Sequence, residues 1–222
     1  MVMNRKTATT IFLSVCVLIS MHAQSLKQQG ISAEDVVPEG WSHNEVTGDL
    51  NKDGIADLVV KSTPNFKENM HTNDDGTVYN YNQPILAIYL GNTDGTLTLW
   101  RQYDQVLSAD DNEDCFHEVT LEITERGVLR ITTSLAYTMG SWAAYTDRYY
   151  YRYQDGDFYL IGKENEELMR NTGKVTTVSE NYLTWKRQVK TEDISEETVP
   201  KEKWSRLQKK PLEKLGARVM GE

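Results

Sequence analysis

Oxygen-bearing side chains occupy every second position of one short segment of the chain. Asp49, Asn51 and Asp53 alternate with other residues, Gly54 follows them, and Asp57 comes three residues later. Ca²⁺ takes about six to eight oxygen ligands in a flexible shell, and a glycine lets the chain reverse around an ion because it tolerates positive φ. The segment therefore predicts a calcium site whose ligands are the side chains of Asp49, Asn51, Asp53 and Asp57 and the backbone carbonyl of Ile55.

The residues after the loop indicate which kind of calcium loop to expect. An EF-hand places a bidentate Glu at the twelfth position of its loop, and that position is Val60 here. The β-branched apolar run that ends at Val60 favours a strand, so we expect the loop to lead into a strand rather than a helix. A loop closed by Asx turns alone, without an ion, is the alternative. If calcium binds, we expect it to tie neighbouring strands together rather than to catalyse a reaction.

The run Gly-Asp-Leu-Asn-Lys-Asp-Gly-Ile-Ala-Asp-Leu-Val-Val at 48–60 resembles the calcium loop of FG-GAP repeats. Such repeats form the blades of integrin alpha-chain propellers and of related bacterial secreted proteins. Residues 87–95 resemble the outer hairpin of the same repeat. The resemblance implies a loop between two strands of a blade, and a role in adhesion or in recognition of a glycan or protein. It also implies that the ion is held at Asp49, Asn51, Asp53 and Asp57. It covers one blade at most, so it does not imply a closed seven-bladed propeller.

The N-terminal residues 1–23 have the pattern of a secretory signal peptide. Arg5 and Lys6 precede an apolar run, and a small-residue cleavage site ends at Ala23. The apolar run is too short to span a bilayer, and no later segment is long and apolar enough to do so. We therefore expect a secreted or periplasmic protein without a transmembrane segment. A lipoprotein signal at Cys16 is the alternative.

The chain is acidic. Cleavage after Ala23 would remove two basic residues and no acid, so the formal charge would fall from −9 to −11. This balance disfavours a nucleic-acid partner, because phosphate binding relies on a basic face. Cys115 would remain as a lone cysteine, and the carboxylates at 110–114 are expected to raise the pKa of its thiol and keep it inert. The same acidic run repeats part of the ligand spacing, but Cys115 stands where the loop glycine belongs; we expect a solvated loop there, with a second calcium site as the alternative.

Segments rich in β-branched and aromatic residues, bounded by turn residues, predict an all-β fold. Hairpin turns are expected at 92–95, 125–127, 154–157 and 179–181. The strands are expected at 57–62, 85–91, 96–103, 118–124, 127–133, 145–153, 157–162, 174–178 and 182–190. This row of hairpins predicts antiparallel sheets. The resemblance favours a small or incomplete propeller-like array, and a β-sandwich or an open barrel is the alternative.

These elements predict one all-β domain at 24–190, which contains the calcium loop at 48–58. Residues 64–84 lack an apolar face and indicate a long polar excursion between strands. Residues 191–222 form a charged C-terminal tail, in which 200–207 predict a short helix. Apolar side chains are expected to pin this tail to the body, namely those of Trp204, Leu207, Leu212 and Leu215.

The sequence contains no familiar catalytic motif. His43, His71 and His117 are too scattered to indicate a general base with its partners. We therefore expect a non-enzymatic protein. The alternative is a secreted hydrolase that uses two carboxylates, or the carbohydrate-binding module of one.

Aromatic residues crowd the predicted hairpin around residues 145–159. Alternation places Tyr149, Tyr151 and Tyr153 on one face of its first strand. One interpretation is packing against neighbouring strands. The other is an exposed platform, extended by Trp142, that stacks on sugar rings or anchors a protein partner.

Overall fold

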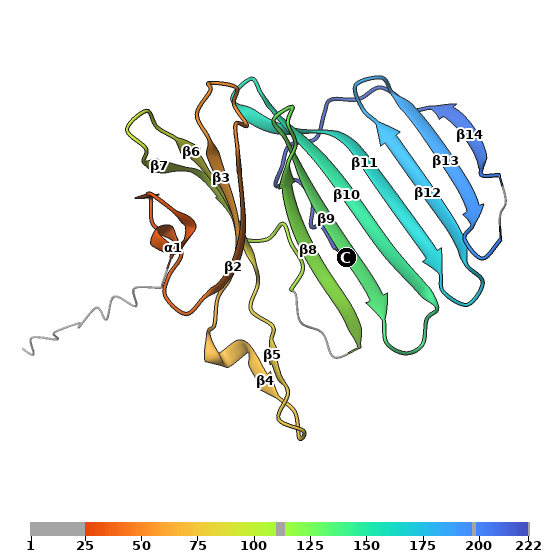
Figure 1. Ribbon diagram of the computed structural model, residues 1–222, viewed down its shortest axis with the longest axis horizontal. Coiled ribbons are helices and arrows are strands. Elements are labelled where there is room, and N and C mark those ends of the chain that lie inside the picture. Colours follow the sequence, from red (N-terminus) through yellow and green to blue (C-terminus); the bar gives the residue numbers. More distant parts are fainter. Residues whose placement is uncertain (1–24, 110–113, 197–198, 222) are drawn as a thin grey trace, which may run out of the picture.

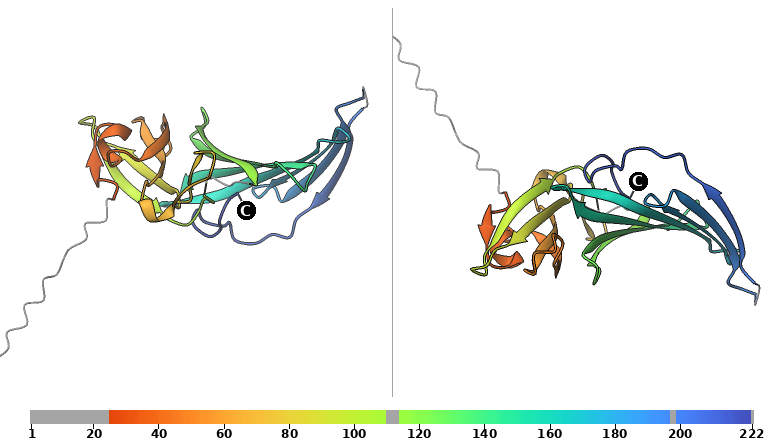
Figure 2. Two further views of the ribbon diagram at one scale, coloured as in Figure 1. Left: turned by 90° about the horizontal axis from the view of Figure 1, so that it is seen from below. Right: turned by 90° about the horizontal axis from the view of Figure 1, so that it is seen from above.

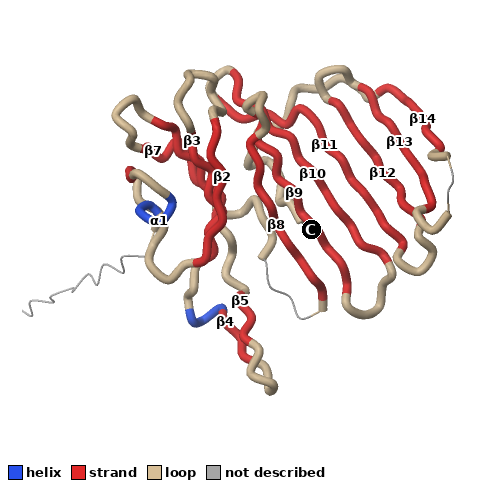
Figure 3. Tube along the Cα trace, in the orientation of Figure 1, coloured by secondary structure: helices blue, strands red, loops and turns tan. Residues whose placement is uncertain are grey.

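The computed structural model describes residues 25–109, 114–196 and 199–221, and nearly all of its regular structure is strand (Figures 1 and 3). The strands form antiparallel sheets, so the predicted all-β antiparallel fold is confirmed. The predicted signal peptide and residues 110–113 of the acidic run lie outside the described residues. The described part of the chain has no helix with the length and apolar character that crossing a membrane requires.

The first sheet contains five strands in the order β1-β7-β6-β3-β2. Four of them follow one another as an antiparallel meander, which is the arrangement of a propeller blade. Their bounds are β1 Gln29–Gly30, β2 Ser42–Gly48, β3 Asp57–Thr63, β6 Ile85–Gly91 and β7 Leu97–Tyr103. Every residue of β3 is buried, because this interior strand has packed side chains on both of its faces. That explains why its apolar residues run consecutively instead of alternating with polar ones.

The second sheet is a seven-stranded meander in which each strand pairs with the next along the chain. It curls along its width, and the C-terminal segment 207–221 crosses its convex side (Figure 2). Its strands are β8 Cys115–Ile123, β9 Val128–Tyr137, β10 Ala143–Gln154, β11 Asp157–Met169, β12 Lys174–Asn181, β13 Lys186–Asp193 and β14 Lys201–Arg206. The two sheets meet where β2 lies beside β8, and the side-chain amide of Asn44 donates to the carbonyl of Val119 there at 3.3 Å.

Small elements complete the fold. Helix α1 (Ala33–Val36) begins after Ser32, whose hydroxyl accepts the Asp35 amide at 3.3 Å. The polar excursion between β3 and β6 contains the 3-10 turn η1 (Lys67–Asn69) and a hairpin of β4 (Met70–Thr72) and β5 (Val78–Asn80). This hairpin projects from the body of the protein (Figure 1).

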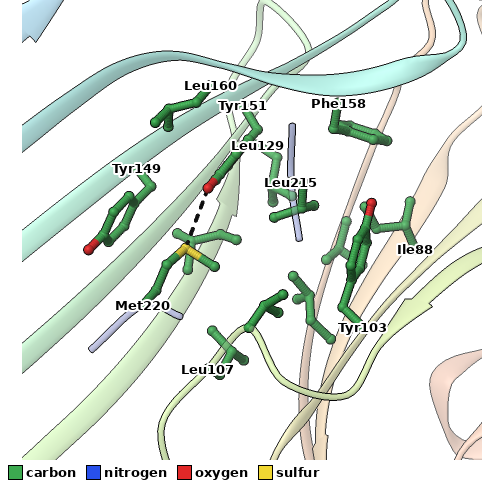
Figure 4. Packing of buried hydrophobic residues seen from close by; sticks show 14 of the residues in the cluster. Ile88, Tyr103, Leu107, Leu129, Tyr149, Tyr151, Phe158, Leu160, Leu215 and Met220 are labelled. Carbon is green, nitrogen blue, oxygen red and sulfur yellow. Dashed lines mark hydrogen bonds between the residues drawn. The ribbon is translucent and has the colours of Figure 1, made fainter. Parts of the chain in front are cut away.

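The main core lies where the two sheets and the C-terminal segment meet. Val59 and Ile88 enter it from the first sheet, and Tyr151 enters it from the second. From the C-terminal segment, Met220 packs against Tyr151, whose hydroxyl lies 3.8 Å from the Met220 sulfur (Figure 4). A second cluster covers the other face of the first sheet and includes Leu26, Val36, Trp41, Leu58 and Tyr89.

Each strand predicted from the sequence overlaps an observed strand, and the turns at 92–95, 125–127 and 154–157 are confirmed by positive φ at their glycines. The turn predicted at 179–181 is wrong, because these residues belong to β12 and the chain turns at 182–185. The helix predicted at 200–207 is also wrong. Residues 201–206 pair with β13 as β14, since an available strand edge outweighs a weak local helical preference.

The C-terminal segment is attached by fewer apolar residues than expected. Leu215 is buried as predicted, and so is Met220, which the sequence did not single out. Backbone hydrogen bonds join Leu215 to Phe158 and Met220 to Val106. Trp204, by contrast, is 62% exposed on the edge strand β14, so it does not pin the tail to the body.

Candidate metal centre

The predicted calcium loop connects β2 to β3 and turns through two residues with positive φ. Gly54 has φ 86° and Lys52 has φ 64°. Glycine tolerates this conformation at no steric cost. The apolar Leu50 is buried in the main core, so it anchors the loop while the polar side chains on either side remain partly or fully exposed.

The first three predicted ligands shape the loop through Asx-type hydrogen bonds. The Asp49 carboxylate accepts the amides of Lys52 at 2.6 Å and Gly54 at 2.9 Å. The Asn51 side-chain oxygen accepts the amide of Asp53 at 3.0 Å, and the Asp53 carboxylate accepts the amide of Ile55 at 2.8 Å. The side-chain oxygens at alternate positions are thereby turned toward the loop's own backbone.

Asp57 is buried completely and joins three parts of the first sheet. One of its carboxylate oxygens accepts the amides of Leu50 at 2.8 Å and Asn51 at 3.4 Å, and the other accepts the amide of Gly91 at 2.9 Å. Burial raises the pKa of Asp57, the three hydrogen bonds lower it, and repulsion from Asp53 raises it; the net shift is upward. Within the described residues, no lysine or arginine forms an ion pair with Asp57, so backbone amides alone stabilise its charge.

The donor set fits a hard cation. Four side chains and a carbonyl supply oxygen only, which is the ligand chemistry of Ca²⁺, and a cation would relieve the repulsion between Asp53 and Asp57. Among the described residues, the carboxylates of Asp49, Asp53 and Asp57 do not all gather within 4.8 Å of one another.

A different group of possible ligands does gather within 4.8 Å: Glu34 of α1 with His43 and Glu45 of β2, all three exposed. An imidazole nitrogen suits Zn²⁺ rather than Ca²⁺, so this group differs chemically from the loop. This group could not be predicted from the sequence, because α1 is brought beside β2 only by the tertiary fold.

The loop also contacts the second sheet. Gly127, in the turn between β8 and β9, has φ 68°, and a Cβ built on it would lie 2.5 Å from the backbone oxygen of Asp49. A Cβ on Gly48 would lie 2.7 Å from the Ile123 side chain. The two glycines therefore allow the loop and the β8–β9 turn to approach closely.

We expect Gly127→Ala to destabilise the protein by about 1–3 kcal/mol more than Gly156→Ala, because overpacking of a close contact costs about that much. Gly156 is the matched control, since its φ of 77° imposes similar backbone strain but no heavy atom lies within 4 Å of its added Cβ. Urea denaturation of both variants measures the difference. Equal losses of stability in the two variants would show that the added methyl group at position 127 causes no overpacking against the loop.

The loop, the strands on either side of it and the polar hairpin after them together match a known family. Residues 44–81 match the family profile of the FG-GAP repeat. The chain carries an FG-GAP repeat. The match runs from β2 through β5 and contains all five predicted calcium ligands. It therefore covers the edge strand β2 of the first sheet and its neighbour β3. No curated protein matches the chain, and no solved structure matches it.

Of the two interpretations of the aromatic hairpin, packing is confirmed for Tyr149, Tyr151 and Tyr153, and the exposed platform is wrong for these three residues. Tyr149 and Tyr151 are buried in the main core, and Tyr153 packs against that core. Their shared face of β10 is covered by the C-terminal segment, which the alternation pattern alone could not reveal. Trp142 is 63% exposed but lies before β10, away from the buried tyrosines.

Cys115 is free and partly buried at the start of β8. Burial, and to a lesser extent the neighbouring Asp114, raises the pKa of its thiol. The direction agrees with the prediction of an inert cysteine, because the thiolate is the reactive form.

Proposed function

We propose that the protein is a secreted or periplasmic, non-enzymatic binding module in which the FG-GAP repeat holds a structural calcium ion. The side chains of Asp49, Asn51, Asp53 and Asp57 and the carbonyl of Ile55 would bind the ion. When bound, it supplies positive charge to a loop that is otherwise closed only by hydrogen bonds. FG-GAP repeats suggest binding rather than catalysis, and this supports the non-enzymatic role.

The observation that carries the proposal is the burial of Asp57. The Asp57 carboxylate is removed from water, forms no ion pair with a described residue and is repelled by Asp53. Burial of such a charge costs free energy of folding. A cation at the loop offsets that cost. The same carboxylate holds the amide of Gly91, so a bound ion would stiffen the β3–β6 connection as well as the loop.

Calcium is expected to raise the melting temperature of the protein relative to EDTA. At a free concentration about 100 times the Kd, a ligand stabilises the native state by about 2.7 kcal/mol, which corresponds to roughly 5–10 °C for a chain of this size. The rise should be absent in Asp53→Ala, because this substitution removes one ligand carboxylate.

Asp94→Ala is the matched control. Asp94 accepts the Thr96 amide at 3.0 Å in an exposed turn of similar shape outside the loop, so its calcium response should equal that of the unmodified protein. A melting temperature that does not change with calcium would mean that the loop is a turn closed by hydrogen bonds alone. The same rise in Asp53→Ala would place the ion elsewhere.

A further inference from the structure

The concave face of the second sheet contains a groove of about 580 Å³. Tyr149 and Tyr151 point to the convex side, where the C-terminal segment covers them (Figure 4). Because successive side chains of a strand alternate between faces, Tyr150 points to the concave side, which is not crossed by that segment (Figure 2). Tyr150 lines the groove, and so does Trp204 of β14.

The floor of the groove follows from the strand register. Tyr150 pairs with Gly162, which has no side chain, and Gly162 pairs with Asn181. A Cβ on Gly162 would lie 3.7 Å from the Tyr150 ring, so the ring lies close against this glycine in the floor of the groove. The register shift between Tyr150 and Tyr151 brings Ile161 into the lining as well.

A row of polar side chains lies between this part of the groove and Trp204. Glu164 pairs with Ser179, Ser179 with Gln188, and Gln188 with Trp204. The Ser179 hydroxyl donates to Glu164 at 2.8 Å. The row therefore offers amide and hydroxyl groups between two aromatic side chains. Tyr150 on β10 and Trp204 on β14 are four strand spacings apart, which is roughly 19 Å along the sheet at about 4.8 Å per strand.

The charge of the groove is positive although the chain as a whole is acidic. Arg126 and Lys186 line it, are exposed, and form no ion pair with any residue that the structure describes. Two carboxylates also line the groove, and each is paired: Glu164 with Arg148 at 2.8 Å and Glu180 with Arg187 at 3.7 Å. An anionic group is thus favoured in the groove, while the net charge of −9 repels anions from the rest of the surface.

We propose that this groove binds an acidic oligosaccharide. Aromatic side chains with one polar end suit the apolar face of a sugar ring, the polar row suits its hydroxyl groups, and Arg126 and Lys186 suit a carboxylate on the chain. The distance between Tyr150 and Trp204 requires several linked rings rather than one. This inference deepens the binding role proposed above, but its residues are separate from the calcium ligands.

Titration calorimetry of the full chain with a uronic-acid octamer (octagalacturonate) tests the proposal. We expect saturable binding that weakens with salt, because the attraction to two exposed cations is screened. A neutral cello-oligosaccharide of similar length should bind at least about tenfold more weakly. Failure of octagalacturonate to bind, or equal binding of the neutral oligosaccharide, would overturn the proposal.

Substitutions test whether the oligosaccharide binds in this groove. Trp204→Ala should weaken it by about tenfold or more, as expected of an aromatic anchor, and Lys186→Glu should also weaken it. Trp142→Ala is the matched control, since Trp142 is as exposed as Trp204 but does not line the groove, and its binding should be unchanged. Equal binding by Trp204→Ala and the unmodified protein would contradict the assignment.

An acidic peptide is the competing occupant. A poly-glutamate peptide that binds as tightly as the uronic-acid octamer would show that the groove recognises charge alone and would overturn the sugar assignment. The calcium response is measured on the same samples. Trp204→Ala should keep its calcium-dependent rise in melting temperature, so loss of sugar binding and loss of the metal site give different results.

Discussion

Replacement of Asp57 by alanine is expected to lower the free energy of unfolding in EDTA by about 3 kcal/mol. The carboxylate accepts the amides of Leu50, Asn51 and Gly91, and each buried donor left without a partner costs about 1–3 kcal/mol. Relief of the buried charge offsets part of this loss. Because Asp57 joins the loop to the end of β6, the loss should be visible in urea denaturation of the whole domain.

The control for Asp57 is Asp75→Ala. Asp75 also accepts a backbone amide, that of Thr77 at 2.9 Å, but in an exposed loop where water can replace the carboxylate. Its substitution should change stability by less than about 0.5 kcal/mol. Similar small losses in both variants would mean that the hydrogen bonds of Asp57 do not hold the loop.

The shifted pKa of Asp57 adds a pH dependence. A carboxylic acid whose pKa is raised on folding contributes stability below its ordinary value of 3.8, and this contribution is lost as pH rises through the folded pKa. Calcium favours the charged form. If the loop binds calcium, the stability difference between calcium and EDTA should therefore grow as pH rises through this range, and should remain flat in Asp53→Ala.

The sequence was informative where structure is decided locally. The loop at 48–58 was visible because its glycine and its alternating oxygen side chains lie within a few residues of each other, and β3 was visible because its buried position demands consecutive apolar residues. The turns at Gly95, Gly127 and Gly156 were visible for the same reason, since positive φ selects glycine.

The parts that could not be predicted depend on distant segments. Apart from Trp204, residues 201–206 are polar or charged, and only the free edge of β13 makes them a strand. Tyr149 and Tyr151 looked as available for binding as Tyr150, because the segment that covers them lies far along the chain and includes Met220, 69 residues after Tyr151. His43 meets Glu34 only because α1 folds against β2.

Phe158→Ala is the substitution with the largest expected loss of stability, because Phe158 contacts distant segments of the chain. Phe158 is fully buried, and its ring lies 5.2 Å from those of Trp100 in the first sheet and Tyr153 in the second. Its carbonyl also accepts the amide of Leu215 in the C-terminal segment. Removal of such a ring costs about 3–5 kcal/mol, because it leaves a cavity as well as lost burial.

Phe158 therefore tests whether the two sheets form one cooperative unit. Urea denaturation, followed by tryptophan fluorescence and by circular dichroism, should give a single transition for the unmodified protein and an earlier one for Phe158→Ala. Phe116→Ala is the control. Phe116 is 60% exposed, so its substitution should change stability by less than about 0.5 kcal/mol. Two separate transitions in Phe158→Ala would mean that this ring couples the first sheet to the second. A single transition with little loss would mean that the coupling lies instead at the contact between β2 and β8.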